Sequence, residues 1–129
     1  VTHSYCWALD RNQWDELDDV FLSDATAVLG TRSAESRDEI KQICSSALTK
    51  LDDSQHIVAT HQVRVDGDTA TCRCYLHAQH IRLEAEGGPH WVVAGRYEDD
   101  LIRTAAGWRI KHRTLAVMWT EGNLAVVRG

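Results

Sequence analysis

The spacing of hydrophobic residues near the start of the chain predicts helices. Residues 2–22 fit two short helices separated by a break near residues 10–12. In the second helix, Trp14, Leu17 and Phe21 recur at helical spacing, and the acidic residues between them form a solvated face. Because the chain opens within the first of these helices, we expect the natural start of that helix to precede the first residue.

A second helical segment follows a short strand. Residues 25–29 are small, β-branched or apolar and end at Gly30, which predicts the strand. Ser36 and Glu39 then match a capping box, in which each side chain satisfies the backbone amide of the other. Behind this cap, one apolar stripe predicts a long helix and comprises Ile40, Ile43, Cys44, Ala47, Leu48 and Leu51.

From residue 56 onward the hydrophobic pattern changes to that of long strands. Four are predicted, over residues 56–65, 69–83, 91–104 and 108–119. The first two are joined by Asp66-Gly67-Asp68, a tight turn in which glycine adopts a positive φ at low cost. Helices followed by an antiparallel meander indicate an α+β fold class, in a single domain over residues 1–129. Strands this long curl, so we expect a cone-shaped α+β barrel, with N-terminal helices packed on a strongly curved, mainly antiparallel sheet that encloses an apolar pocket.

Composition and charge exclude two classes of partner. The chain is 43% hydrophobic and 26% charged, which is typical of a globular domain. Its 14 Lys and Arg against 19 Asp and Glu give a formal charge of −5, without the positive cluster that nucleic-acid binding needs. No run approaches the ~20 apolar residues that span a bilayer. We therefore expect neither a nucleic-acid nor a membrane partner.

The cysteines predict a reduced protein without a metal. Cys72 and Cys74 share one face of a strand and are too close in sequence to bridge in extended backbone. We expect these two, Cys6 and Cys44 to be small buried residues in a reducing, cytoplasmic compartment. No Cys/His spacing has the compact form of a zinc site, and no glycine-rich phosphate loop is present. We therefore expect no metal site and no nucleotide cofactor.

Asp10 and His56 are the candidate catalytic residues. Asp10 ends an apolar helical stretch, where its carboxylate is costly to bury without a partner, and His56 opens the first long strand. A buried Asp–His pair explains both positions, since the carboxylate fixes the imidazole tautomer and leaves the other ring nitrogen as a general base. Two plainer interpretations stay open: Asp10 caps the next helix through an Asp-x-x-Gln pattern, or His56 faces solvent.

The other candidate residues are placed less firmly by spacing. Tyr5 precedes Asp10 by five positions, about 140° around a helix, so a core position is the alternative to a place in the site. Aromatic side chains in the core bury much area, and some of them can line a pocket. The candidate substrate-binding residues are Trp7, His77, Trp91 and Trp119.

Four segments of the sequence resemble the SnoaL-like family of the nuclear-transport-factor-2-like superfamily, and together they cover nearly the whole chain. They are Tyr5-x-x-x-x-Asp10 ahead of Trp14-x-x-Leu17, His56 followed by Val65-Asp-Gly-Asp-Thr-Ala70, Gly95-Arg-Tyr-Glu-Asp99, and Gly107-Trp-Arg-Ile110 with Arg113. Members of this family include bile-acid 7α-dehydratase, scytalone dehydratase, hexachlorocyclohexane dehydrochlorinase and polyketide cyclases, together with non-catalytic subunits.

The resemblance implies roles for three residues. In dehydratase-like members the strand histidine is the base, the helical aspartate pairs with it, and the helical tyrosine binds or protonates the departing oxygen. These roles fall on His56, Asp10 and Tyr5. An acidic residue that bile-acid dehydratase carries on its second long strand has no match here, so the resemblance leaves His77 or His80 to supply a different polar group.

We therefore expect a cofactor-independent lyase or isomerase that acts on a small apolar, oxygenated ring compound such as a polyketide, steroid or aromatic. Water loss, double-bond shift and cyclisation share one proton abstraction, and the sequence does not choose among them. A non-catalytic ligand-binding or assembly subunit of the same fold is the alternative, and a zinc-dependent hydrolase is a third. Because the last strand is apolar on both faces, we expect a homodimer or higher homo-oligomer formed through the sheet.

Overall fold

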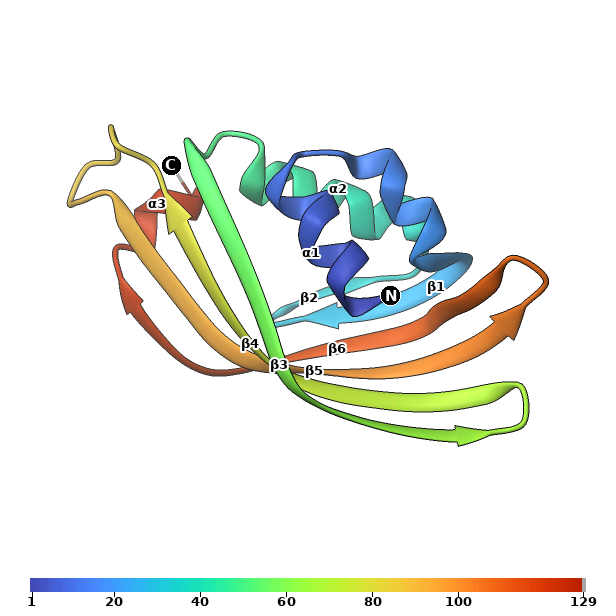
Figure 1. The fold of residues 1–129 in the computed structure, drawn as a ribbon. Coiled ribbons are helices and arrows are strands. Elements are labelled where there is room, and N and C mark those ends of the chain that lie inside the picture. Colours follow the sequence, from blue (N-terminus) through green and yellow to red (C-terminus); the bar gives the residue numbers. More distant parts are fainter. Residues whose placement is uncertain (129) are drawn as a thin grey trace.

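The strands form one curled sheet, and the helices lie along its concave side (Figure 1). The computed structural model describes residues 1–128. In chain order the elements are α1 (Thr2–Asp10), the 3-10 helix η1 (Trp14–Asp19), β1 (Phe21–Leu29), β2 (Arg32–Ala34), α2 (Arg37–Leu48), β3 (Asp53–Asp66), β4 (Thr69–Ile81), β5 (His90–Thr104), β6 (Gly107–Gly122) and α3 (Ala125–Arg128). The sheet order is β2-β1-β6-β5-β4-β3, so β2 and β3 are its edges. The predicted α+β class is confirmed.

Strands β3 to β6 form the predicted antiparallel meander, and its register shifts at three places, once between β3 and β4 and twice between β5 and β6. Gly67 turns the chain between β3 and β4 at a φ of 61°. From this turn the register runs evenly to Gln62, which lies opposite Arg73. A β-bulge then shifts the pairing by one residue, and Thr60 within it has a φ of 61°. A β-branched residue in this left-handed region is strained, so the surrounding sheet must hold it there.

The N-terminal part differs from the sequence-based prediction at one boundary. Phe21 was expected at the end of a helix, but η1 ends at Asp19 and Phe21 begins β1. Strand β1 runs parallel to β6, with Phe21 opposite Ile110. This pairing with a strand almost ninety residues away overrides the local helical spacing. The elements β2 and α3, of three and four residues, are too short to give a periodic signal.

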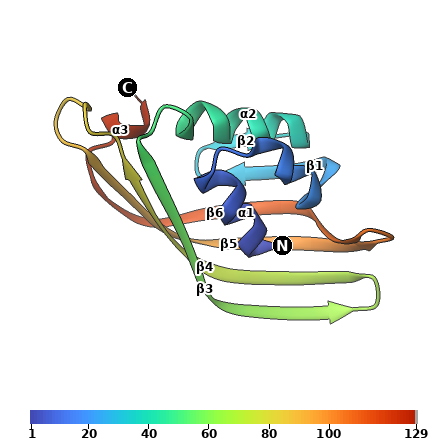
Figure 2. The ribbon, with the colours of Figure 1, turned by 45° about the horizontal axis from the view of Figure 1, so that its top comes forward.

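Helix α2 begins at the predicted cap. The Ser36 hydroxyl accepts a hydrogen bond from the Glu39 amide at 3.1 Å. The Glu39 carboxylate, however, accepts from the amide of Glu35 and not from that of Ser36. Ile40, Cys44 and Leu48 are the residues of the apolar stripe that are buried. Figure 2 shows α1 and α2 side by side over the same face of the sheet, which closes the core between them and the strands.

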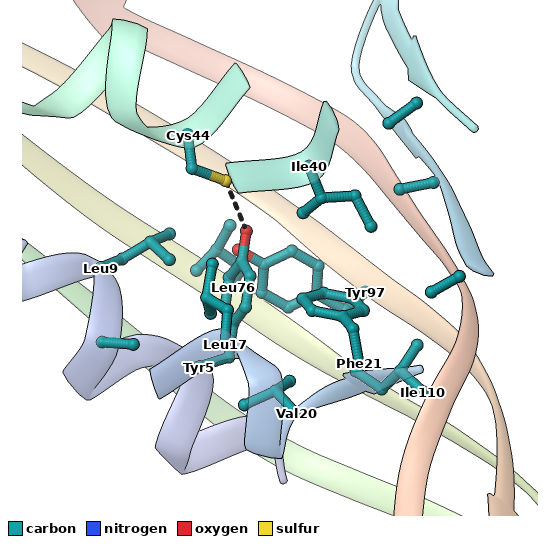
Figure 3. Packing of buried hydrophobic residues seen from close by; sticks show 14 of the residues in the cluster. Tyr5, Leu9, Leu17, Val20, Phe21, Ile40, Cys44, Leu76, Tyr97 and Ile110 are labelled. Carbon is teal, nitrogen blue, oxygen red and sulfur yellow. Dashed lines mark hydrogen bonds between the residues drawn. The ribbon is translucent and has the colours of Figure 1, made fainter. Parts of the chain in front are cut away.

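The centre of the core contains an ion pair between aromatic rings. Arg113 is fully buried, and its Nε and Nη2 donate to the two carboxylate oxygens of Asp99, each at 2.7 Å. The Arg113 guanidinium lies 4.3 Å from the ring centroid of Tyr5 and 3.9 Å from that of Tyr97. Figure 3 shows these two tyrosines and Phe21 packed beneath α2. Aromatic faces and a bidentate carboxylate together compensate the buried charge.

Two further findings concern the whole described chain. All four cysteines are free and buried, as expected. Among the helices found in residues 1–128, none has the length and apolar character needed to cross a membrane.

The buried ion pair generates a stability prediction. Substitution Asp99→Ala leaves the Arg113 guanidinium charged and uncompensated in the core, so we expect the free energy of unfolding to fall by about 3–5 kcal/mol. Glu98→Ala, one residue earlier in β5, removes an exposed pair with Arg96 at 3.2 Å and should cost less than about 1 kcal/mol. Urea denaturation followed by circular dichroism measures both. Equal losses in the two variants would contradict this account of the core.

Candidate active site

The carboxylate of Asp10 joins the end of α1 to the edge strand β3. Its Oδ1 lies 2.6 Å from His56 Nδ1, and its Oδ2 accepts the His56 backbone amide at 2.9 Å. The Ser54 hydroxyl donates to Oδ1 at 3.1 Å. Asp10 therefore holds the His56 ring and also covers an amide on the free edge of the sheet. It is not the cap of η1, whose N-cap is Gln13 and has no side-chain hydrogen bond.

The contact with Asp10 fixes which nitrogen of His56 is free. A carboxylate only accepts hydrogen bonds, so the shared proton sits on Nδ1, and in the neutral ring Nε2 carries the lone pair. The His56 side chain is 5% exposed and that of Asp10 is 18% exposed, so the pair is screened from bulk water. In residues 1–128 the His56 ring makes this one hydrogen bond, and Nε2 is not engaged. The arrangement can accept a proton at Nε2 and stabilise the resulting imidazolium.

A second histidine ring meets the first. His80, in β4, is 6% exposed, and its ring centroid lies 5.8 Å from that of His56 at an interplanar angle of 83°. Its Nδ1 lies 3.0 Å from the carbonyl oxygen of Trp91, which fixes the proton on Nδ1 and the lone pair on Nε2. Burial lowers the pKa of His80 to about 4, so the ring is neutral at neutral pH.

Tyr5 lies in the core. It is 2% exposed, and its hydroxyl contacts the Cys44 Sγ of α2 at 3.6 Å (Figure 3). Its ring packs edge-on against Phe21 and Tyr97. Burial raises the pKa of Tyr5 well above its ordinary value, so the hydroxyl keeps its proton at neutral pH. The structure thus directs the Tyr5 hydroxyl at α2, and not at the Asp10–His56 pair.

The four predicted substrate-binding residues are divided between separate surfaces. His77 and Trp119 lie in register with Ala94, on the convex face of the sheet, where their rings are 5.8 Å apart. They alternate with inward-facing neighbours and so do not share the site of His56. Trp91 is half-buried, lies opposite His80 and orients it through its carbonyl. Trp7 is 60% exposed on α1, with the Arg11 guanidinium 4.9 Å from its ring centroid.

The bulge in β3 determines the face of the sheet on which His56 lies. Counted evenly from the turn at Gly67, His56 falls opposite Gln79 and shares its face with His77. The bulge at Thr60 moves His56 opposite Ala78 and so onto the concave face, which His80 occupies through the alternation of β4 itself. The sequence left both histidines open, although the alternation of β4, in which Ala70, Cys72, Cys74, Leu76 and Ala78 are buried, is a signal that places His80 inward.

An open groove leads to the pair. It lies between α1 and β3, has a volume of about 600 Å³ and reaches both Asp10 and His56. Its other lining residues are His3, Cys6, Trp7, Arg11 and residues 53–55 and 57–58. In the part of the chain that the structure covers, no group of three or more His, Cys, Asp or Glu side chains is placed to hold a metal ion.

Comparisons with known proteins agree with this architecture. A family model described as a SnoaL-like domain matches residues 1–114. An uncharacterized protein of Mycobacterium tuberculosis is 34% identical over 114 residues, which are 84% of this chain and 75% of that protein. The terrestric acid biosynthesis cluster protein E of Penicillium crustosum is 32% identical over 110 residues, covering 80% of this chain and 69% of that protein.

Solved structures share the fold at lower identity. The Kfla4162 protein of Kribbella flavida has a TM-score of 0.89 at 24% identity, over 99% of this chain and 92% of that one. A protein of Novosphingobium aromaticivorans provisionally named a scytalone dehydratase has a TM-score of 0.85 at 22% identity, over 95% of this chain and 82% of that one. A hexachlorocyclohexane dehydrochlorinase, LinA type 2, has a TM-score of 0.82 at 13% identity, over 95% of this chain and 83% of that one.

The buried His80 ring generates a pH prediction. Its pKa of about 4 lies below the ordinary value of 6.5, so the unfolded chain binds the proton first as the pH falls. The contribution of His80 to stability is complete above pH 6.5 and is lost on acidification toward pH 4, by about 1.4 kcal/mol per pH unit. We expect the His80 ring resonances to stay unchanged between pH 8 and pH 5.5 in an NMR titration. A midpoint near 6.5 would show that the ring is not buried as described.

Proposed function

Because the chain belongs to the SnoaL-like domain family, we propose that it is a cofactor-independent lyase or isomerase whose general base is His56. The observation that carries this proposal is the 2.6 Å contact between His56 Nδ1 and Asp10 Oδ1. It leaves Nε2 as a base in a position shielded from water, with a carboxylate ready to stabilise the charge that forms.

The proposed reaction begins with a carbon-bound hydrogen next to an activating group such as a carbonyl. His56 Nε2 takes the proton, and the electron pair of the C–H bond moves toward the activating group. The neutral ring becomes an imidazolium beside the Asp10 carboxylate, which the Ser54 hydroxyl and the His56 amide hold in place. General-base assistance of this kind contributes about 100- to 10,000-fold in rate. Elimination, double-bond isomerisation and cyclisation all continue from this intermediate.

The relatives favour elimination on small organic molecules. One structural neighbour bears the name of a dehydratase and another that of a dehydrochlorinase, and a sequence relative belongs by name to a biosynthetic cluster. We therefore propose a small apolar, oxygenated ring compound, such as a polyketide, steroid or aromatic, as the substrate. In this proposal Tyr5 supports the core under α2, and the departing group takes its proton from the His56 imidazolium.

The proposal predicts the effects of two substitutions. We expect His56→Gln and Asp10→Asn each to lower turnover by about 100-fold or more. The first substitution removes the base, and the second removes the carboxylate that stabilises the imidazolium. Asp24→Asn, an exposed carboxylate of β1, is the matched control and should leave turnover unchanged. Turnover is measured by proton NMR in D₂O on a panel of cyclic β-hydroxyketones and hydroxylated aromatic compounds.

A second measurement on the same variants needs no substrate. Nitrogen-15 NMR of the His56 ring should show the Nδ1–H tautomer in the native chain and a loss of this preference in Asp10→Asn. The Nε2–H tautomer in the native chain would refute the assignment of His56 as the base. The non-catalytic alternative then becomes the better account of this domain.

We also propose that two copies associate through the convex face of the sheet. Four large apolar side chains, Ile57, Tyr75, Met118 and Trp119, are each about half exposed there. Patches of this kind, bordered by polar rows, mark contact surfaces. Such a dimer is compatible with catalysis and with an assembly role.

The dimer is tested by exchanging a tryptophan on either side of the molecule. Trp119→Glu places a charge in the centre of the apolar patch and should convert the dimer to a monomer in light scattering after size-exclusion chromatography. Trp7→Glu, at a somewhat more exposed tryptophan on α1, should leave the dimer intact. A native chain that is monomeric at micromolar concentration contradicts the proposal.

A further inference from the structure

The outward side chains of the four long strands form rows that cross the convex face of the sheet. One row is apolar except for a histidine, and it runs in register from β3 to β6 through Ile57, His77, Ala94 and Trp119. The next row towards the β3–β4 turn contains Tyr75 in β4 opposite Arg96 in β5. The row after it contains Arg73 in β4 opposite Glu98 in β5. In each row, therefore, β4 and β5 carry different kinds of side chain.

Arg73 and Glu98 keep hydrogen-bonding capacity that this chain does not use. Arg73 donates from Nε to the neutral side chain of Gln62 at 2.7 Å, and its two terminal nitrogens make no hydrogen bond within residues 1–128. Glu98 accepts from Arg96 at 3.2 Å through Oε1, while its Oε2 accepts no hydrogen bond in that same part of the chain. Both side chains line an open hollow of about 460 Å³. A molecule that covers the convex face can therefore pair here with a cation and with a carboxylate.

Two copies of one face can pack about a two-fold axis that lies in the plane of contact, so that every contact occurs twice. An axis parallel to the strands, between β4 and β5, lays β4 of one copy over β5 of the other. Arg73 then meets the partner's Glu98, and Tyr75 meets the partner's Arg96. An axis at right angles to the strands, through the apolar row, instead lays each strand on its own copy, where Arg73 meets the partner's Ile81. The parallel axis is therefore the one that makes the rows complementary.

We propose that a second copy of this chain binds the convex face about the parallel axis, with Arg73 of each copy paired to the partner's Glu98. This inference rests on the proposed function in one respect, that two copies associate through this face, and it adds their orientation. A displacement of the axis onto β4 would oppose two Arg73 side chains, and one onto β5 two Glu98 side chains, so repulsion disfavours both alternatives. The Tyr75 ring and the partner's Arg96 add a cation–π contact beside the ion pair.

The same orientation brings a residue of the second copy to the candidate active site. Ile57 belongs to the apolar row, is 51% exposed and also lines the groove beside α1 that reaches His56. Because β3 lies over the partner's β6 in this orientation, Ile57 meets the partner's Trp119. The dimer thus adds an apolar wall at the rim of the groove, next to the proposed base, that a single copy does not provide.

Two charge-reversal variants, examined alone and as a mixture, test the pairing. In Arg73→Glu two carboxylates meet at each contact, and in Glu98→Arg two guanidinium groups do, so we expect the dimer dissociation constant of each to rise about tenfold or more. In the mixture, a dimer with one chain of each kind has opposite charges at both contacts, and we expect it to predominate in native mass spectrometry. Arg64→Glu, which reverses a charge at the same hollow, is the control for Arg73→Glu and should not pair preferentially with Glu98→Arg.

Each outcome of the mixing experiment has a separate meaning. Random pairing in the mixture, or single variants that dimerise as the native chain does, overturns the orientation. A native chain that is monomeric at micromolar concentration refutes the proposed dimer and the orientation with it. Neither result bears on the role of His56, which is tested by turnover and by its tautomer.

A measurement on the native chain guards against a variant that fails to fold. Ile57 and Trp119 lie three strands apart within one chain, about 14 Å at the usual strand spacing, which is too far for a nuclear Overhauser effect. In a dimer of one carbon-13-labelled and one unlabelled chain, we expect isotope-filtered NMR to show this effect between the Ile57 methyl groups and the partner's Trp119 ring. The absence of this effect, or an effect between Ile57 and the partner's Ile57 as the axis at right angles requires, overturns the proposal.

Discussion

A single extra residue in β3 places His56 on the concave side of the sheet. The bulge around Thr60 shifts the β3–β4 register by one, and side chains alternate between faces, so every inward residue beyond the bulge depends on it. With the bulge, His56 joins the concave face on which the alternation of β4 places His80, and His77 faces outward. Thr60 is held at a φ of 61°, a conformation that costs about 1–3 kcal/mol for a residue of this type. The sheet therefore maintains a strained position on which its pair of histidines depends.

The free edge of the sheet and the candidate base are stabilised by the same carboxylate. β3 has no strand beyond it, and its exposed amides invite pairing with another chain. The Asp10 carboxylate occupies this edge at His56, where it accepts hydrogen bonds from the backbone amide and from the ring Nδ1. The helix that brings Asp10 there also carries Tyr5 into the core, where its ring covers the Arg113 guanidinium. The packing of α1 against the sheet thus also protects the free edge of β3 and orients the candidate base.

The sequence was sufficient to predict an element of the fold wherever the interaction that determines it is local. The meander follows from alternating apolar residues and the turn at Gly67, and the cap of α2 follows from Ser36. The pairing of Asp10 with His56 is not local, and the residues alone left it open beside a capping role for Asp10 and a solvent position for His56; the resemblance to the SnoaL-like family favoured the pair. The parallel pairing of β1 with β6 could not be predicted, because no local pattern encodes a distant strand. The face of His56 could not be predicted either, because Thr60 carries no glycine or other signal of a bulge.

The two faces of β4 place histidines in different surroundings. On the inward face, His80 is buried, neutral and fixed by a backbone carbonyl beside His56. On the outward face, His77 stacks on Trp119 within an exposed apolar surface, which suits a protein contact. The same residue type, three positions apart, thus belongs to two different kinds of site. Assigning chemistry to a strand histidine therefore requires the face on which it lies, which the alternation of β4 gives for His77 and His80 and the bulge in β3 gives for His56.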